Sequence, residues 1–333
     1  MPSRNSNTLT VEQILAGTSF GPTQSVGQME VIPILDAGSA SDESWAPPRF
    51  SAGTQTYGAV QARNLDTTRP TIAPLGSGFI TKQAAQDHAI LSAAFVGPGE
   101  NKSIPHAVCI QQTQPGTITQ SEDTQMVILP ASLRVRGLSL RKGTELGRMW
   151  EHIQNFHRSM GVTGGSGRGD LVLFLQHFEK ELDEFVAEFE LLPKQIGAVV
   201  LINGVVVGVE RAPNVEFWNA LWNPLIRVCY GSLAIKARNL FGTTPPPTRT
   251  ALTVRTKSLA GIAAALTDAK VESARKIVAS YDAMKSTPLL YGGAADGKLN
   301  KAELFTVANS ALAGQIVLSG SAMPYVSLGA SGA

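Results

Sequence analysis

A β-hairpin at residues 196–210 constrains the fold more strongly than any other segment of the chain. The sequence there reads IGAVVLINGVVVGVE, so that two β-branched runs flank Asn203 and Gly204. Asn-Gly supplies the two residues with positive φ that a type I′ turn requires, and this turn matches the twist of paired antiparallel strands. We therefore predict an antiparallel sheet that contains this hairpin.

Further strand patterns occur in the first half of the chain. Residues 29–35 read MEVIPIL and predict a strand that enters the fold. Between residues 71 and 140, short apolar runs alternate with turn residues, including Pro-Gly at 98–99 and 115–116. This spacing predicts a small antiparallel sheet or sandwich that extends through the segment MVILPASLRVRGLSL at 126–140.

Helical periodicity follows in three stretches. Apolar residues three or four positions apart predict an amphipathic helix from Leu146 to Met160, ended by Gly161. A second helix is expected at 171–189, and a third at 215–238, which Pro224 should kink or split. The predicted fold class is α+β, with an antiparallel sheet or sandwich core at 71–240 and flanking helices.

Segments on both sides of this core differ from it in composition. Residues 1–35 hold an N-terminal segment and the first strand, and residues 36–70 are rich in Ser, Gly, Thr, Pro and Ala. We expect the latter to form a long irregular arm, which either contacts a neighbouring subunit or is a flexible insertion. Consecutive prolines at 241–250 predict a stiff spacer. A helical appendage is expected at 251–333, with helices near 258–267, 271–285 and 300–312 and a strand-like tail of about twenty residues.

Charge excludes some partners and favours others. The chain has 28 basic and 26 acidic residues, a net charge of +2, and only 16% charged residues. No dense Lys/Arg cluster could neutralise several phosphates, which argues against nucleic acid as a partner. A weakly charged surface lowers the electrostatic cost of packing copies together, so the composition favours a homo-oligomer.

The sequence gives no sign of secretion or membrane insertion. No apolar stretch reaches the roughly 18 residues that cross a bilayer, and the N-terminus MPSRNSNTLTVEQ lacks the apolar core of a signal peptide. Cys109 and Cys229 are the two cysteines, and they form no Cys-x-x-Cys pair. We therefore expect a cytoplasmic protein without a membrane partner.

The glycine-rich segment GGSGRG at 164–169 allows two interpretations. Flexible glycines before a helix can present free amide groups to an anion, and Arg168 would add a positive charge. The segment follows a helix rather than a strand and lacks the Lys-Ser/Thr of a P-loop, which favours a linker between helices.

Other candidate sites are weaker. His152 and His157 are five positions apart and do not share the face of a helix that chelates zinc. Cys109 and His106 would lie on opposite faces of a strand, so we expect Cys109 to be a core residue rather than a nucleophile. Residues 292–303 match half of a calcium loop, but two ligand positions hold Gly and Ala. We expect neither a metal nor a cofactor.

Three segments, in order, resemble the ARG and rhodanese-phosphatase-superfamily-associated domain family over residues 18–237. They are SFGPTQSVGQMEVIPIL at the start, SIPHAVCIQQ in the centre, and the hairpin QIGAVVLINGVVVGVE with the Phe/Trp-rich helix after it. A Trp-bearing helix at Trp150 lies between the second and the third. The family is named for its genomic company with ADP-ribosylglycohydrolases and phosphatases, so the resemblance implies a link to NAD or ADP-ribose.

This chain also departs from the family pattern. The segment LGSGFITKQAAQ keeps Lys82 and Gln83 but replaces two acids and an arginine, and Gln111 stands where relatives have an acid before Gln112. A neutral amide cannot take a proton, so the resemblance implies that a carboxylate-based mechanism is lost at these positions.

Two functions follow from these observations. The first is a non-enzymatic, self-associating structural protein of a phage particle or other large assembly, in which the arm at 36–70 and the tail reach neighbouring copies. The alternative, linked to NAD or ADP-ribose, is a module that binds a small nucleotide-type ligand or an enzyme of the family that the chain resembles. Its candidate site residues are Lys82, Gln83, Gln111, Gln112 and Arg168.

Overall fold

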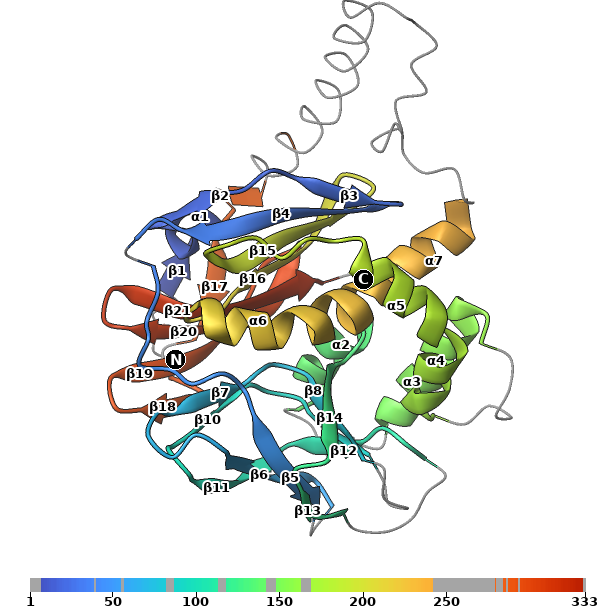
Figure 1. Ribbon diagram of the computed structural model, residues 1–333, viewed down its shortest axis with the longest axis horizontal. Helices are drawn as coiled ribbons and strands as arrows, with labels where there is room; N and C mark the ends of the chain where they lie inside the picture. Colours follow the sequence, from blue (N-terminus) through green and yellow to red (C-terminus); the bar gives the residue numbers. More distant parts are fainter. Residues whose placement is uncertain are drawn as a thin grey trace, which may run out of the picture.

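The predicted hairpin lies inside the largest sheet of the molecule (Figure 1). In this computed structural model, Asn203 and Gly204 have φ angles of 51° and 76°, as a type I′ turn requires. The structure describes residues 7–38, 40–54, 57–81, 87–112, 118–141, 148–162, 169–241, 279, 284–285, 287–292 and 294–331.

The main sheet has eleven strands, and all their pairings are antiparallel. In order across the sheet, nine of them are β1 (Asn7–Leu9), β17 (Leu289–Tyr291), β19 (Ala302–Ala308), β20 (Leu312–Ser319), β21 (Ala322–Ala330), β16 (Val205–Arg211), β15 (Gln195–Ile202), β4 (Met29–Asp36) and β2 (Thr18–Phe20). Two short strands complete it: β18 (Gly297–Leu299) pairs with β19, and β3 (Gln24–Val26) pairs with β4.

Three smaller sheets lie below the main sheet in Figure 1. One contains β11 (Asn101–Pro105), β6 (Ala59–Asn64), β5 (Phe50–Thr54) and β13 (Ile118–Ser121), in that order. Another contains β12 (Ala107–Cys109), β9 (His88–Ile90), β8 (Ser77–Thr81) and β14 (Thr124–Ile128), and the third pairs β10 (Ala94–Val96) with β7 (Thr71–Ala73).

Helices cover the sheets and separate them. They are α1 (Val11–Ile14), α2 (Ala131–Leu140), α3 (Arg148–Met160), α4 (Leu171–His177), α5 (Glu179–Ala187), α6 (Val215–Asn223), the π-helix η1 (Pro224–Tyr230) and α7 (Gly231–Phe241). Figure 1 shows α6 between the main sheet and the smaller sheets, with α3, α4, α5 and α7 at one side. This is the predicted α+β fold, an antiparallel sheet core with flanking helices.

The apolar residues of β15 alternate between two cores. Ala198 and Val200 face a cluster that includes the α6 residues Trp218 and Trp222. Their neighbours Val199 and Leu201 face a second cluster on the other side of the sheet, where α1 packs. A strand in the middle of a covered sheet is buried on both faces, which explains the nearly continuous apolar run in the sequence.

A polar network is buried between the main sheet and the helices. The Arg134 guanidinium of α2 lies 2.6 Å from the Glu210 carboxylate of β16, and the Tyr230 hydroxyl donates to the same carboxylate at 2.5 Å. Arg134 also donates to the Ser327 hydroxyl of β21 at 3.0 Å. Because a buried charge is costly unless it is paired, this network holds α2, η1, β16 and β21 in one arrangement.

The segment 36–70 is not an irregular arm. Residues 50–54 and 59–64 form β5 and β6, the two middle strands of a smaller sheet, and Trp45 packs in the core against Phe95 with ring centroids 5.7 Å apart. The many small residues allow close strand packing here rather than flexibility.

Residues 131–140 form a helix, where the sequence predicted a strand. Leu133 and Val135 alternate with polar residues, which resembles a strand locally. However, Leu133, Gly137 and Leu138 are buried at helical spacing in α2. The helix packs on β20 and β21. Contact with these distant strands therefore decides the structure of this segment.

The C-terminal region is not a helical appendage where the structure describes it. Residues 302–308 form β19, where a helix was predicted near 300–312, because β18 and β20 pair with this segment on its two sides. The strand-like character of the tail is confirmed by β20 and β21. The spacer at 242–250, the helix near 258–267 and most of the helix near 271–285 lie outside the described residues.

The three central helical predictions are confirmed, with two details that periodicity did not show. The second helix divides at Phe178 into α4 and α5. The third does not split at Pro224; instead, the chain passes from α6 into η1 and then α7. Proline lacks the N–H that would bond to the preceding turn, so a change of helical register at this residue costs little.

Candidate functional site

Three segments that are far apart in the sequence meet beside the start of α4. The Asp87 carboxylate accepts a hydrogen bond from the Thr81 amide at 2.8 Å, and the Asp87 amide donates to the Gln111 side chain at 3.3 Å. Gln111 forms an isolated antiparallel bridge with Asp170. We call Asp87, Gln111, Gln112 and Asp170 the Asp87 cluster.

Gln112 closes the junction on the α4 side. Its amide donates to the Gly169 carbonyl at 3.2 Å, and its side-chain oxygen accepts from the Gly169 amide at 2.8 Å. A Cβ atom at Gly169 would lie 2.6 Å from the Trp150 backbone, so α3 fits against this position because it is a glycine. Both residues of the Gln111–Gln112 pair therefore lie where two distant segments join.

Asp170 begins α4. Its side chain accepts a hydrogen bond from the Val172 amide at 3.2 Å, which is the contact an N-cap aspartate normally makes. The preceding residues 163–168 lie outside the described part of the chain, and so does Arg168.

The structure brings together the flanks of the predicted site. Lys82 and Gln83 also lie outside the described residues. The residues on either side of their segment, Thr81 and Asp87, are joined by a hydrogen bond. Gly169, the residue after Arg168, contacts Gln112. Gln111 and Gln112 thus contact residues that lie directly beside the two segments with the other three candidates.

The Asp87 carboxyl lies in an unusual electrostatic environment. The residue is only 2% exposed. Burial raises its pKa to about 6, and the negative charge of Asp170 adds to this increase, while the hydrogen bond from Thr81 opposes it. Asp87 therefore exchanges a proton close to neutral pH, where most aspartates are fully ionised.

Neither carboxylate of this pair was predicted from the sequence. The resemblance implied that carboxylate chemistry is lost because the family's acids are replaced nearby, but Asp87 and Asp170 put two acidic groups into the same junction. Asp170 could have been noticed as a capping residue directly before an apolar helix. Asp87 carries no local signal, since its surroundings come from distant segments.

Cys109 is buried, as predicted, and is not activated. Its thiol donates to the Gln111 carbonyl at 3.0 Å. Burial raises the thiol pKa to about 11, although the Gln111 backbone and the Trp150 side chain oppose the shift. A nucleophilic cysteine needs a lowered pKa, so this thiol is poorly suited to the role.

Among the described residues, no group of three or more His, Cys, Asp or Glu side chains could hold a metal ion. The residues of the half calcium loop have other partners. Asp296 accepts from Arg141 at 3.0 Å and from Thr306 at 2.5 Å, and Glu303 pairs with Lys298.

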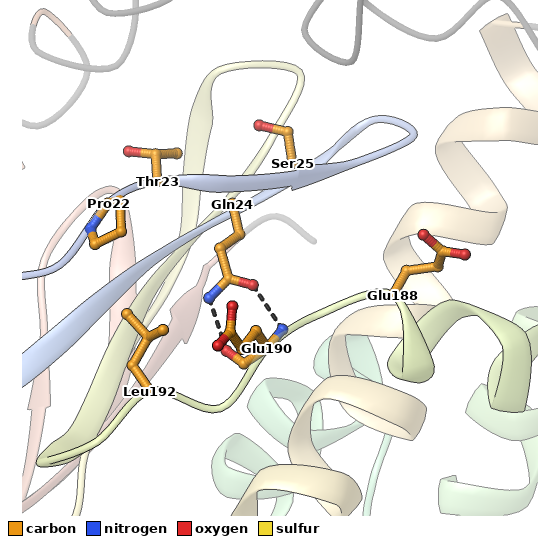
Figure 2. Close-up of a pocket in the computed structure, with 7 residues that line it drawn as sticks. All are labelled: Pro22, Thr23, Gln24, Ser25, Glu188, Glu190 and Leu192. Atoms are coloured by element: carbon orange, nitrogen blue, oxygen red, sulfur yellow. Dashed lines mark hydrogen bonds between the residues drawn. The ribbon is translucent and has the colours of Figure 1, made fainter. Parts of the chain in front are cut away.

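A surface pocket of about 380 Å³ lies between the β3 hairpin and the segment after α5 (Figure 2). Gln24 spans it, since its side chain donates to the Glu190 carbonyl and accepts from the Glu190 amide, both at 2.7 Å. Figure 2 shows that these two bonds occupy the Gln24 amide. The other residues that line the pocket are Pro22, Thr23, Ser25, Glu188 and Leu192. The pocket is the gap between two segments that Gln24 connects. None of its lining residues belongs to the Asp87 cluster.

In the described part of the chain, no helix has both the length and the apolar composition that a membrane crossing needs. No curated protein and no solved structure matches the chain. A family model does match, over residues 17–295, which include the Asp87 cluster and most of the elements described above. The chain therefore belongs to the family of the ARG and Rhodanese-Phosphatase-superfamily-associated Protein domain.

Proposed function

We propose that the protein binds a ribose-containing nucleotide, of the NAD or ADP-ribose type, through the Asp87 cluster. The observation that carries this proposal is the Asp87 carboxyl, which is buried beside Asp170 and has a pKa near 6. Acids with strongly perturbed pKa values are enriched at functional sites, because binding and catalysis use groups whose burial costs stability.

The chemistry of the cluster suits a sugar. Carboxylates accept hydrogen bonds from the vicinal hydroxyls of a ribose, as acidic residues do in dinucleotide-binding folds. Amides such as Gln111 and Gln112 can both donate and accept. The name of the family supports a nucleotide of the ADP-ribose class, but the proposal rests on the residues of this chain.

Calorimetry tests this proposal with a pair of minimal probes. Ribose 5-phosphate should bind, and 2-deoxyribose 5-phosphate should bind about ten- to a hundredfold more weakly, because a carboxylate loses a hydrogen bond of roughly 1.5–3 kcal/mol. ADP-ribose and NAD should bind more tightly than ribose 5-phosphate.

Two conservative variants localise the binding. Asp87→Asn keeps an oxygen for the Thr81 amide, and Asp170→Asn keeps a good helix cap, so both should fold and both should weaken ribose binding. Asp123→Asn, at an exposed turn, is the matched control. Absence of heat with ADP-ribose at millimolar concentration would overturn the proposal.

Self-association as a structural protein is a second candidate function. It is favoured by the low content of charged residues, 16%, and by Phe20, which is 45% exposed on β2 at one edge of the main sheet. The arm at 36–70 and the tail, which were expected to reach neighbouring copies, contain strands that pair within the chain's own sheets. Copies would therefore have to associate through a sheet edge. Light scattering after size exclusion tests it, and a stable monomer at micromolar concentration would count against it. In either function, we place the protein in the cytoplasm.

A further inference from the structure

A second pocket, of about 330 Å³, is formed by residues in or beside β5, β8, β14 and the end of α6. It is lined by Pro48, Arg49, Phe50, Leu65, Phe79, Glu122, Thr124, Met126, Ala220 and Pro224. Its volume is at the small end of the range for ligand pockets, so it suits a single ring with short substituents.

Apolar side chains from three strands form the floor of this pocket. The rings of Phe50 and Phe79 meet edge to face, with centroids 6.3 Å apart. Phe79 and Met126 are register partners on β8 and β14, so the sheet fixes their spacing. Aromatic rings and a thioether together pack well against another aromatic ring.

Two opposite charges lie at the rim. Arg49 and Glu122 are both exposed, and neither side chain has a hydrogen-bond or ion-pair partner among the described residues. By contrast, the partly exposed Arg69 is paired with Asp66 and Glu216. The guanidinium and the carboxylate at the pocket therefore remain available to a ligand.

We propose that this pocket binds an aromatic zwitterion of the α-amino acid type. The ring lies on Phe50, Phe79 and Met126, the ligand carboxylate pairs with Arg49, and its ammonium group pairs with Glu122. The lining has one cation and one anion, so a ligand that carries both charges satisfies both, whereas a simple aromatic acid leaves Glu122 unpaired. This inference does not depend on the Asp87 cluster.

Three ligands with the same ring separate the contributions of the two charges. L-phenylalanine carries both, 3-phenylpropionate only the anion, and L-phenylalaninamide only the cation, as the first residue of a peptide does. Saturation-transfer NMR should detect all three rings on the full chain, with L-phenylalanine bound most tightly.

Charge-removing variants complete the test. Arg49→Gln should weaken L-phenylalanine and 3-phenylpropionate about tenfold and leave L-phenylalaninamide unchanged, because one charge-assisted hydrogen bond is lost. Glu122→Gln should weaken L-phenylalanine and L-phenylalaninamide and leave 3-phenylpropionate unchanged. Lys301→Gln, an exposed cation on the turn before β19, is the matched control and should change none of them.

Both charged positions are exposed, so neither variant should disturb folding. The proposal is overturned if L-phenylalanine gives no saturation transfer at millimolar concentration, or if either charge variant binds it as wild type does. Tighter binding of L-phenylalaninamide than of L-phenylalanine would also overturn it, in favour of a peptide terminus.

Discussion

The raised pKa of Asp87 makes the stability of the fold depend on pH. Its pKa is about 6 in the folded protein, against 3.8 for an ordinary aspartate, so the folded state holds this proton more tightly than the unfolded chain does. Between pH 4 and pH 6 the folded state binds more protons, and stability falls as the pH rises through this window. Above pH 6 the cost is complete, at about 3 kcal/mol for a shift of two units.

Asp87→Asn should therefore stabilise the protein at pH 8 while weakening ribose binding. The amide has no charge to desolvate, so we expect a gain of up to about 3 kcal/mol in the free energy of unfolding. The gain should disappear at pH 4, where the wild-type carboxyl is already protonated. Urea unfolding at the two pH values measures both quantities, and an Asp87→Asn protein less stable than wild type at pH 8 would contradict this account.

Gly208 shows how closely the buried network is packed. A Cβ atom at this position would lie 1.9 Å from the Tyr230 hydroxyl, which donates to Glu210. Gly208→Ala should displace Tyr230 and leave the Arg134–Glu210 pair short of a partner, at a cost of about 3 kcal/mol or more. Urea unfolding measures it, with Gly292→Ala as the control because no atom lies within 4 Å of that added Cβ. Equal stability of the two variants would be evidence against a tightly packed network.

At the level of residues, part of the candidate site could be predicted from the sequence. Gln111 and Gln112 were found because a short strand motif around them resembles the family. Asp87 was not, because only the meeting of three distant segments distinguishes it. Asp170 has a local signal as a helix cap, but no local pattern places it beside Asp87.

Secondary-structure elements were predictable where local contacts form them. The hairpin at β15 and β16 follows from its own turn, and α3 from its own apolar stripe. By contrast, α2 and β19 were assigned the wrong type. The strands on which α2 packs lie far away in the sequence. β19 has near neighbours, β18 and β20, but its own residues show no strand pattern that would have revealed this pairing. β-structure depends more on neighbours than helical structure does, which explains why β19 was missed.

Tyr325 tests the attachment of β21 to the rest of the fold. Its hydroxyl accepts a hydrogen bond from the Leu75 amide at 2.9 Å in a buried position. Tyr325→Phe leaves that amide without a partner and should cost about 1–3 kcal/mol of stability by urea unfolding. Tyr57→Phe, at a side chain that is 76% exposed, should cost close to nothing. A similar loss in both variants would indicate that the Leu75 contact contributes little.

For the whole molecule, the domain boundary set by the family match is not a folding boundary. The match ends at residue 295, but β19, β20 and β21 lie in the middle of the main sheet, between β17 and β16. Ser327 and Tyr325 also complete buried polar contacts with elements before that boundary.

A chain that ends at residue 295 should therefore fail to fold cooperatively. It lacks β21, one of the two strands that pair with β16, and exposes the buried Arg134–Glu210 pair. Circular dichroism during thermal unfolding should show a broad transition or none, whereas a chain that ends at residue 331 should melt like the full chain. A sharp transition in the shorter chain would show that the last strands are dispensable.

The order of strands in the main sheet also bears on synthesis at the ribosome. β1, which leaves the exit tunnel before every other described strand, pairs with β17 some 280 positions later, and the position beside β16 is filled only by β21. Nearly the whole chain must be translated before this sheet can close, so the nascent protein carries open strand edges for most of its translation. Because contacts between distant segments slow folding, we expect the growing chain to benefit from chaperones that shield unpaired strands.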